Sequence, residues 1–207
     1  MATLQRIRNH DLIERVGHWV HLLNLILLVL SGIAIHAPSY NVFGSLDAAR
    51  MVHFVDMYVF SFIGVFHVYQ FFALGKWSVA GPTPRNLGGT WQTIKYYLFL
   101  RDRKPAYGKY NPLQIISYVL LFALSAVQAV LGFALYWPAG MGVVVGAFGG
   151  LMGLRQAHYL VSWVFIAFTM IHLYLVLTQP LRLTKSMITG SFWRRTADRA
   201  RQGRGQY

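Results

Sequence analysis

The sequence predicts an all-α membrane protein built as a bundle of four transmembrane helices, and three observations predict it. Of the 207 residues, 56% are hydrophobic and only 12% are charged, a composition typical of polytopic membrane proteins. The apolar residues are gathered in four long segments. Nearly all lysines and arginines lie outside those segments, and their distribution predicts how the helices are oriented in a membrane.

The four predicted transmembrane helices cover residues 16–36, 51–74, 112–137 and 155–179. Each holds about 20 residues or more, the length needed to cross a hydrocarbon core of about 30 Å. Tryptophans and tyrosines lie near the segment ends, as they do in the aromatic belts of membrane proteins. We expect the whole chain, 1–207, to form one membrane domain.

The connections between these helices differ in composition. Residues 138–154 are rich in glycine and apolar residues, and we expect them to pack or re-enter the membrane rather than form a fifth span. Residues 75–111 form a longer, basic connection. Within it, residues 90–100 have apolar and aromatic side chains at helical spacing, which predicts an amphipathic helix on the membrane surface. The tail, 180–207, is basic, and we expect it to be poorly ordered from residue 194 on.

The basic residues predict the orientation of the chain. Seventeen of the 19 lysines and arginines lie before the first predicted helix, between the second and third, or after the fourth. The positive-inside rule therefore places both termini and the long basic connection in the cytoplasm. The net charge of +13 then reflects topology and anionic lipid headgroups, and it does not indicate nucleic-acid binding. The first 19 residues carry acids and lack a small-residue cleavage site, so we expect no cleavable signal peptide.

Histidines recur at matching depths in the predicted helices. His158 and His172 lie 14 positions apart in the fourth helix. This is nearly four turns, so their rings project from one face about 21 Å apart. His53 and His67 have the same spacing in the second helix. With the predicted orientation, His53 and His158 lie near the outer side of the membrane, and His18, His67 and His172 lie near the inner side.

Haem b is the cofactor that fits paired histidines at two depths. The chain contains no cysteine, which excludes covalent CxxCH attachment, thiolate metal sites and cysteine-ligated iron–sulfur clusters within it. Two imidazoles per iron leave no open coordination position, so the predicted chemistry is electron transfer. The outer pair is His53 with His158. In the inner pair, His172 is matched by either His18 or His67.

Other uses of intramembrane histidine are weaker explanations of this pattern. A single histidine in a span usually packs against a neighbouring helix or hydrogen-bonds to it. Two at this spacing, matched by histidines in other spans, favour a cofactor. Zinc is disfavoured because its sites gather the ligands within a few ångströms of one another. A proton relay is compatible with the haems as an additional role.

Several stretches of the sequence, in this order, carry a resemblance to a known family: IERVGHWVHLLNLILLVLSGIAI, ARMVHF, YGKYNPLQ, GFALYW and HYLVSWVFIAFTMIHLYL. They are distributed along nearly the whole length of the chain. They resemble the di-haem cytochrome b subunit, the gamma or anchor subunit, of respiratory membrane-bound nickel–iron hydrogenases and formate dehydrogenases. Thiosulfate reductase anchors are more distant relatives of that family. The run before the third predicted helix is slightly more similar to the hydrogenase anchors.

The resemblance implies roles for the histidines. It implies that His18 and His172 bind the iron of the inner haem, and that His53 and His158 bind the iron of the outer haem. The family tends to carry a basic residue at the position of His67. His67 is therefore expected in the surroundings of the inner haem, and it remains the alternative inner ligand.

The resemblance also implies a quinone site beside the inner haem, in the segment KYNPLQ. Asn111 and Gln114 have side chains that can hydrogen-bond to a quinone carbonyl. A plain helix start explains the same residues, because asparagine is a common N-cap and Pro112 suits the first helical position. The two roles are compatible.

These expectations combine into a predicted function. The chain is expected to be the membrane anchor and electron-transfer subunit of a respiratory complex. It passes electrons from a periplasmic iron–sulfur subunit, which has its own catalytic partner, through two haem b groups to membrane quinone. Hydrogenase is slightly favoured over formate dehydrogenase. The alternatives are a stand-alone bacterial b561-type cytochrome, a thiosulfate reductase-type anchor, and a transporter or structural anchor without haem.

Overall fold

The computed structural model describes residues 4–8, 10–75, 81–103, 105, 107, 110–178 and 181–195. The chain divides into two compact units. The larger unit comprises residues 6–63 and 126–193, and the smaller one is built around residues 64–125.

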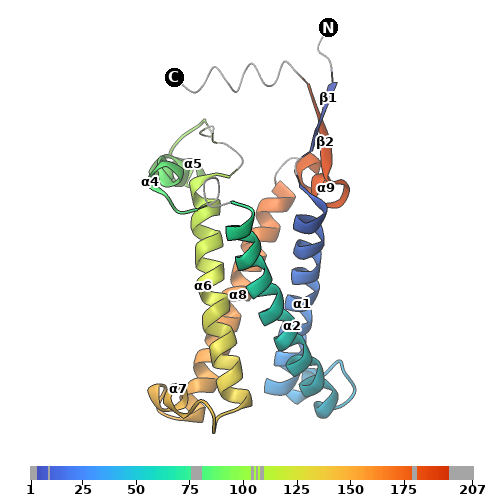
Figure 1. Ribbon diagram of the computed structural model, residues 1–207, viewed down its shortest axis with the longest axis vertical. Coiled ribbons are helices and arrows are strands. Elements are labelled where there is room, and N and C mark those ends of the chain that lie inside the picture. The colour runs from blue at the N-terminus through green and yellow to red at the C-terminus, as the bar shows by residue number, and fades with distance from the viewer. Residues whose placement is uncertain are drawn as a thin grey trace. The chain divides into compact units, whose positions relative to one another are not determined.

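Four long helices dominate the described chain (Figure 1): α1 (Leu12–His36), α2 (Leu46–Ala73), α6 (Pro112–Tyr136) and α8 (Leu151–Thr178). All four are long and apolar enough to cross a membrane. They confirm the four predicted transmembrane helices. The predicted limits were late by about one turn for α1, α2 and α8: the first turns of α1 and α2 contain charged residues, and the first turn of α8 lies in the glycine-rich segment that was assigned to the connection.

The larger unit holds all of α1 and α8, the first part of α2 and the last part of α6. Leu131 and Ala134 of α6 are buried together with Leu154 of α8 and form an apolar core there. The ring of Tyr58 in α2 meets the ring of Phe133 in α6 edge to face, with centroids 5.4 Å apart. Aromatic and small apolar residues therefore join these helices.

Many large apolar side chains on the long helices are exposed at the protein surface. Leu160 and Tyr174 of α8, for example, are 64% and 63% exposed. In water such a surface would be a liability, but lipid chains are as apolar as leucine and solvate it. The four apolar helices and their exposed faces fit a multi-pass membrane protein.

Helix α1 begins at a complete capping box. The Asp11 carboxylate accepts a hydrogen bond from the backbone N–H of Glu14 at 2.8 Å, and the Glu14 carboxylate accepts one from the N–H of Asp11 at 3.4 Å. These bonds satisfy donors that the first helical turn leaves open. The helix ends at His36, just before Pro38 opens a short 3-10 turn (Pro38–Tyr40).

A small sheet and a short helix form additional structure beside the start of α1. Strands β1 (Leu4–Arg8) and β2 (Ser191–Arg195) pair with each other, and α9 (Leu181–Thr189) precedes β2 (Figure 1). The all-α fold class predicted from the sequence did not include this sheet. The expectation of poor order from residue 194 on was wrong for two residues, since β2 extends to Arg195. The remainder of that prediction falls on residues 196–207, outside the described residues.

Side chains of α1 bind the last turn of α9. Trp19 donates from its indole N–H to the carbonyl of Met187 at 3.1 Å, and the Arg15 guanidinium donates to the carbonyl of Ile188. The carbonyls at a helix C-terminus have no intrahelical donors, so such bonds are stabilising. Gly190 follows with φ +80, a conformation that favours glycine. The tail is thereby fixed to α1, which hydropathy did not predict.

The smaller unit contains the last part of α2, the first part of α6 and two short helices, α4 (Pro84–Leu87) and α5 (Thr90–Tyr97). Helix α5 matches the helix predicted within residues 90–100. Its buried Thr93 donates to the Tyr107 hydroxyl at 2.8 Å, and that hydroxyl donates to the carbonyl of Gly89 at 2.7 Å. Trp91, on the other face, is 61% exposed. This helix is amphipathic, and its place at a membrane surface stays a prediction.

The glycine-rich connection 138–154 does not form a fifth span. It contains the short helix α7 (Gly142–Ala147), and α8 begins within it at Leu151. Gly153 lies against the carbonyl oxygen of Phe148, where a Cβ atom would overlap that oxygen. Glycine is therefore required for the tight entry into α8. Met141, Val144 and Val145 of this connection pack against the apolar core, and the expectation that it forms no fifth span is confirmed.

Candidate functional site

Two pairs of histidines face each other in the larger unit. The rings of His18 in α1 and His172 in α8 have centroids 6.2 Å apart and an interplanar angle of 56°. The rings of His53 in α2 and His158 in α8 have centroids 6.3 Å apart and an interplanar angle of 73°. Helix α8 thus contributes one ring to each pair. We call them the His18–His172 pair and the His53–His158 pair.

The separation of the rings matches two imidazoles on one metal ion. A metal–imidazole nitrogen bond is about 2 Å long and the ring centre lies about 1.1 Å beyond the nitrogen, so two such rings on opposite sides of one ion have centres about 6.2 Å apart. Both pairs have this separation. Each pair therefore has the separation expected if its two rings held one haem iron.

The two pairs are separate sites. His158 and His172 are 14 positions apart on one continuous helix, which corresponds to about 21 Å along its axis. Among the described residues no cluster of three or more histidine, aspartate or glutamate side chains could hold a metal ion. The donor sets are thus pairs of imidazoles, which suit haem iron better than a compact four-ligand zinc site.

A serine of α1 holds the His53 ring. The Ser31 side-chain oxygen lies 2.9 Å from Nδ1 of His53 and donates to the carbonyl of Leu27 at 2.6 Å. Ser31 is fully buried. Next to it, a Cβ atom at Gly32 would lie 3.5 Å from Cε1 of His53. The ring therefore contacts a hydroxyl at one position of α1 and bare backbone at the next.

A glutamine of α6 lies beside the His158 ring. Gln128 donates from Nε2 to Oγ of Ser162 at 2.8 Å and to the carbonyl of His158 at 3.2 Å, and the same nitrogen lies 3.4 Å from Nε2 of His158. Nδ1 of His158 and Oε1 of Gln128 are buried without a hydrogen-bond partner in the part of the chain that the structure describes. A buried imidazole nitrogen with no protein partner is consistent with a ring that serves a bound group.

A second glycine adjoins this ring. A Cβ atom at Gly132 of α6 would lie 3.4 Å from Cε1 of His158 and 3.5 Å from Sδ of Met57. These are ordinary van der Waals distances, so a Cβ atom would fill the space beside the ring, and a side chain larger than alanine would displace the imidazole or the methionine. Gly32 and Gly132 thus leave open space beside the His53–His158 pair.

The His18–His172 pair has a less polar setting. The Trp19 ring meets the His18 ring edge to face, with centroids 5.4 Å apart. His172 is exposed at the protein surface. Within the described residues, neither of these two rings takes part in a side-chain hydrogen bond like the one that Ser31 makes to His53. The polar side chains thus gather around the other pair.

The remaining histidines of the spans lie elsewhere. His67 belongs to the smaller unit, where its ring contacts Phe66 with centroids 6.4 Å apart. His21 meets Phe60 edge to face at 6.2 Å, and His36 stacks on Tyr159 at 4.4 Å. Of the two partners considered for His172, the structure brings His18 beside it within one unit.

The residues expected at a quinone site form the start of α6. Oδ1 of Asn111 accepts from the N–H of Gln114 at 2.9 Å, and Oε1 of Gln114 accepts from the N–H of Asn111 at 2.9 Å. This reciprocal pair is a capping box, and Pro112 occupies the first helical position. The helix-start explanation therefore applies. The cap uses both side-chain oxygens, so the two amide NH₂ groups are the donors left for another role.

Sequence reasoning missed a buried polar pair between α1 and α2. Asn24 and Asp56 are only 2% and 8% exposed. Nδ2 of Asn24 donates to Oδ1 of Asp56 at 2.5 Å and to its backbone carbonyl at 3.1 Å. The signal that could have found it is the single acid within the apolar run of the second span, because intramembrane acids usually have a partner.

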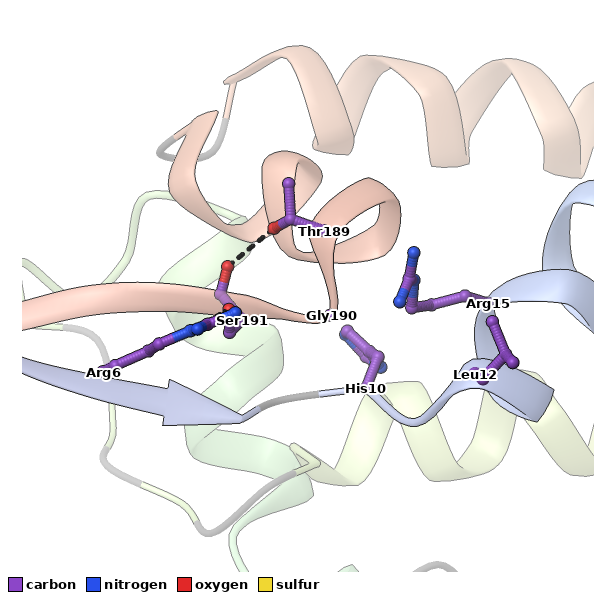
Figure 2. A pocket seen from close by; sticks show the side chains of 7 residues that line it. All are labelled: Arg6, His10, Leu12, Arg15, Thr189, Gly190 and Ser191. Carbon is purple, nitrogen blue, oxygen red and sulfur yellow. Dashed lines mark hydrogen bonds between the residues drawn. The ribbon is translucent and has the colours of Figure 1, made fainter.

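A pocket of roughly 400 Å³ lies where the start of α1 meets the end of α9 (Figure 2). Arg6 and Arg15 lie in its wall on either side of His10 and Gly190. Nε of Arg6 donates to Oγ of Ser191 at 2.9 Å, and His10 pairs with Glu14 at 3.4 Å. Arg6 thus already binds the tail, and His10 binds the first turn of α1. The residues that line the pocket include neither histidine pair.

Comparison with known proteins identifies a cytochrome family and several cytochrome subunits with similar sequences. The sequence matches the family described as prokaryotic cytochrome b561 over residues 9–190. It is 27% identical over 203 residues to a probable Ni/Fe-hydrogenase B-type cytochrome subunit of Azotobacter vinelandii, covering 84% of this chain and 82% of that protein. A protein of the same description from Cupriavidus necator is 26% identical, with 84% and 80% covered. A probable Ni/Fe-hydrogenase 1 B-type cytochrome subunit of Escherichia coli K12 is 25% identical, with 84% of each covered.

Proposed function

Because the chain belongs to the prokaryotic cytochrome b561 family, we propose that it is the membrane anchor and electron-transfer subunit of a respiratory oxidoreductase complex. The resemblance inferred from the sequence motifs is confirmed by the family match and by the hydrogenase cytochrome subunits. The observation that carries the proposal is the pairing of four histidines from α1, α2 and α8 at the spacing of two imidazoles on one iron.

The proposed ligands are His18 and His172 for an inner haem, and His53 and His158 for an outer haem. Haem b held at these positions supplies one-electron redox chemistry. Two imidazoles for each iron would leave no open position for oxygen or substrate, so the haems would carry out electron transfer. His67 is proposed to lie in the surroundings of the inner haem, and it is the alternative ligand if His18 is not one.

The orientation proposed for the chain places both termini on the cytoplasmic side of the inner membrane. It rests on the distribution of the basic residues. An iron–sulfur subunit on the outer side, with its catalytic subunit, would then donate electrons to the chain. The names of the relatives favour a nickel–iron hydrogenase as this partner over a formate dehydrogenase.

Membrane quinone is the proposed electron acceptor on the inner side. The NH₂ groups of Asn111 and Gln114 are the proposed donors to a quinone carbonyl, since the capping box leaves them unused. The capping box also holds both side chains in place at the start of α6, so their orientation costs little on binding.

Purification of the full chain from membranes tests this function. We expect two haem b groups per chain, sharp reduced b-type bands, and copurification with an iron–sulfur subunit. Absence of the b-type bands would contradict the haem assignment and favour a transporter or structural anchor. Two haems in a chain that never copurifies with a partner would favour a stand-alone b561-type cytochrome, which the family description also permits.

A further inference from the structure

We propose that Ser31 is a positioning residue for the outer haem: its hydroxyl fixes the His53 imidazole with Nδ1 protonated and Nε2 free for the iron, and thereby lowers the reduction potential of that haem. This inference rests on the proposed haem assignment. It adds a role that neither the family nor the relatives' names assign, and it concerns one haem of the two.

The direction of the hydrogen bonds follows from the helix. A hydroxyl has one hydrogen, and the Ser31 hydroxyl lies 2.6 Å from the carbonyl of Leu27. A backbone carbonyl can only accept, so the hydroxyl donates to Leu27. In the 2.9 Å contact between Ser31 and His53, the imidazole therefore donates from Nδ1 and the serine oxygen accepts. The lone pair of His53 consequently lies on Nε2, the nitrogen available to a metal ion.

The geometry leaves the ring little freedom. Ser31 is fully buried, so water does not compete for the hydroxyl. Gly32, the next residue, lets the ring lie against the backbone of α1, with only 3.5 Å between Cε1 of His53 and the position of a Cβ atom. The carbonyl of Leu28 is a further hydrogen-bond partner of the His53 ring. The Ser31 hydroxyl and the backbone of α1 therefore hold the imidazole together, and Gly32 leaves space beside it.

His53 is the paired histidine whose ring contacts a hydroxyl in the described part of the chain, whereas the His158 ring meets the Gln128 amide through Nε2 at 3.4 Å. Nδ1 of His158 is buried with no partner, and no side-chain hydrogen bond is present on the rings of His18 and His172 in that part. An imidazole that donates from its outer nitrogen is a stronger electron donor to the metal. Stronger donation favours ferric iron, so the hydrogen bond should lower the potential of the outer haem alone.

Ser61 offers a matched control. It lies in the same unit, and its hydroxyl donates to the carbonyl of Met57 at 2.9 Å, four residues back, as Ser31 does to Leu27. No histidine ring contact to the Ser61 hydroxyl is recorded among the described residues. Ser61→Ala therefore removes the same backbone contact without altering a haem ligand.

The test is a redox titration of the full chain carrying Ser31→Ala, Ser31→Thr, Ser31→Val or Ser61→Ala, with EPR spectra of the ferric haems. Ser31→Ala should raise the potential of one haem, by up to about tenfold in its ratio of reduced to oxidised form, which is about 59 mV for a one-electron couple. The EPR signal of the same haem should change. Ser61→Ala should change neither haem.

The valine and threonine variants have the same shape and differ in the hydroxyl. Ser31→Thr should stay close to the wild-type potential, whereas Ser31→Val should resemble Ser31→Ala. Equal potentials in the two variants, or a shift in Ser31→Ala no larger than in Ser61→Ala, would overturn the proposal. If Ser31→Ala binds no outer haem, the comparison of threonine with valine decides in the same way.

The failure of this inference is distinguishable from failure of the haem assignment. In the His172→Ala background only the outer haem should remain, and the Ser31 effect should persist on that haem. Two haems in that background would contradict the ligand assignment itself. One haem whose potential does not respond to Ser31→Ala would leave the assignment intact and reject the role of Ser31.

Discussion

At the scale of single residues, the two histidine pairs are alike in spacing and different in surroundings. Their ring centroids are 6.2 and 6.3 Å apart. His53 is held by a buried hydroxyl, His158 lies beside an amide, and the other pair lacks such bonds in the described chain. Since hydrogen bonds to axial ligands tune iron, two haems of the same type are expected to differ in potential.

His172→Ala should remove the inner haem and leave the outer haem in place, because only the His18–His172 pair loses a ring. The haem content of the purified chain should fall by half, as measured from the reduced b-type spectrum, and quinone reduction should be lost. His21→Ala is the matched control, since that ring contacts Phe60 and belongs to neither pair. Retention of both haems in His172→Ala would show that another residue binds the inner iron.

Gln114→Glu should weaken quinone reduction while both haems stay bound. Glutamate keeps the oxygen that accepts the Asn111 N–H in the capping box but lacks the amide NH₂ donor. The expected change is a higher KM for quinone with an unchanged haem spectrum. Gln114→Ala removes the cap as well and should also lower stability by about 0.5–1 kcal/mol. Unchanged quinone kinetics and inhibitor affinity in both variants would place the quinone elsewhere.

At the scale of helices, the buried Asn24–Asp56 pair joins α1 to α2. Both side chains are nearly inaccessible, and the asparagine amide donates twice to Asp56. Because His18 and His53 lie on these same two helices, the pair also helps to hold a ligand of each proposed haem in register. Hydrogen bonds between transmembrane helices are individually modest, so the effect should appear in stability before it appears in haem content.

Asn24→Leu should lower the stability of the detergent-solubilised protein by about 1–2 kcal/mol, because it leaves the buried Asp56 side chain without its donor. The double variant Asn24→Leu/Asp56→Leu should recover part of that loss, since no polar group is then left unpaired. Thermal unfolding monitored through the haem absorbance measures both. A double variant that is as unstable as the sum of its single changes would mean that the two side chains act independently.

At the scale of the whole molecule, the chain combines four apolar helices with a strongly basic set of connections and ends. From this charge the positive-inside rule predicts an orientation, and the predicted orientation would place one histidine pair near each side of the membrane. The prediction that electrons enter at the outer side and leave at the inner side depends on that assignment.

The absence of cysteine from the sequence allows a direct test of orientation. A cysteine introduced at the exposed Ser39 should react with a membrane-impermeant maleimide in intact spheroplasts, because it follows the first transmembrane helix on the outer side. A cysteine at the exposed Arg103 should react only after lysis. The reverse pattern would invert the membrane orientation and exchange the inner and outer haem assignments.

The sequence predicted the long elements well and the contacts between them poorly. Helices α1, α2, α6 and α8 follow from runs of apolar residues, and the start of α6 follows from Asn111 and Pro112. The attachment of the tail to α1 through Trp19 was not predicted, because it depends on backbone carbonyls at the end of α9. The Asn24–Asp56 pair was missed although its acid stood out in an apolar run.

The sequence by itself predicted the four transmembrane helices and the histidines expected at matching depths, and its lack of cysteine excludes thiolate chemistry within the chain. These properties depend on local composition and on the regular rise of a helix. Only the tertiary structure decided that the His172 ring faces His18 within one unit, and that Ser31 and Gln128 surround the other pair. Those contacts depend on how each helix is rotated about its axis. A helix that faces lipid on one side and protein on the other is apolar all round, so its sequence does not encode that rotation.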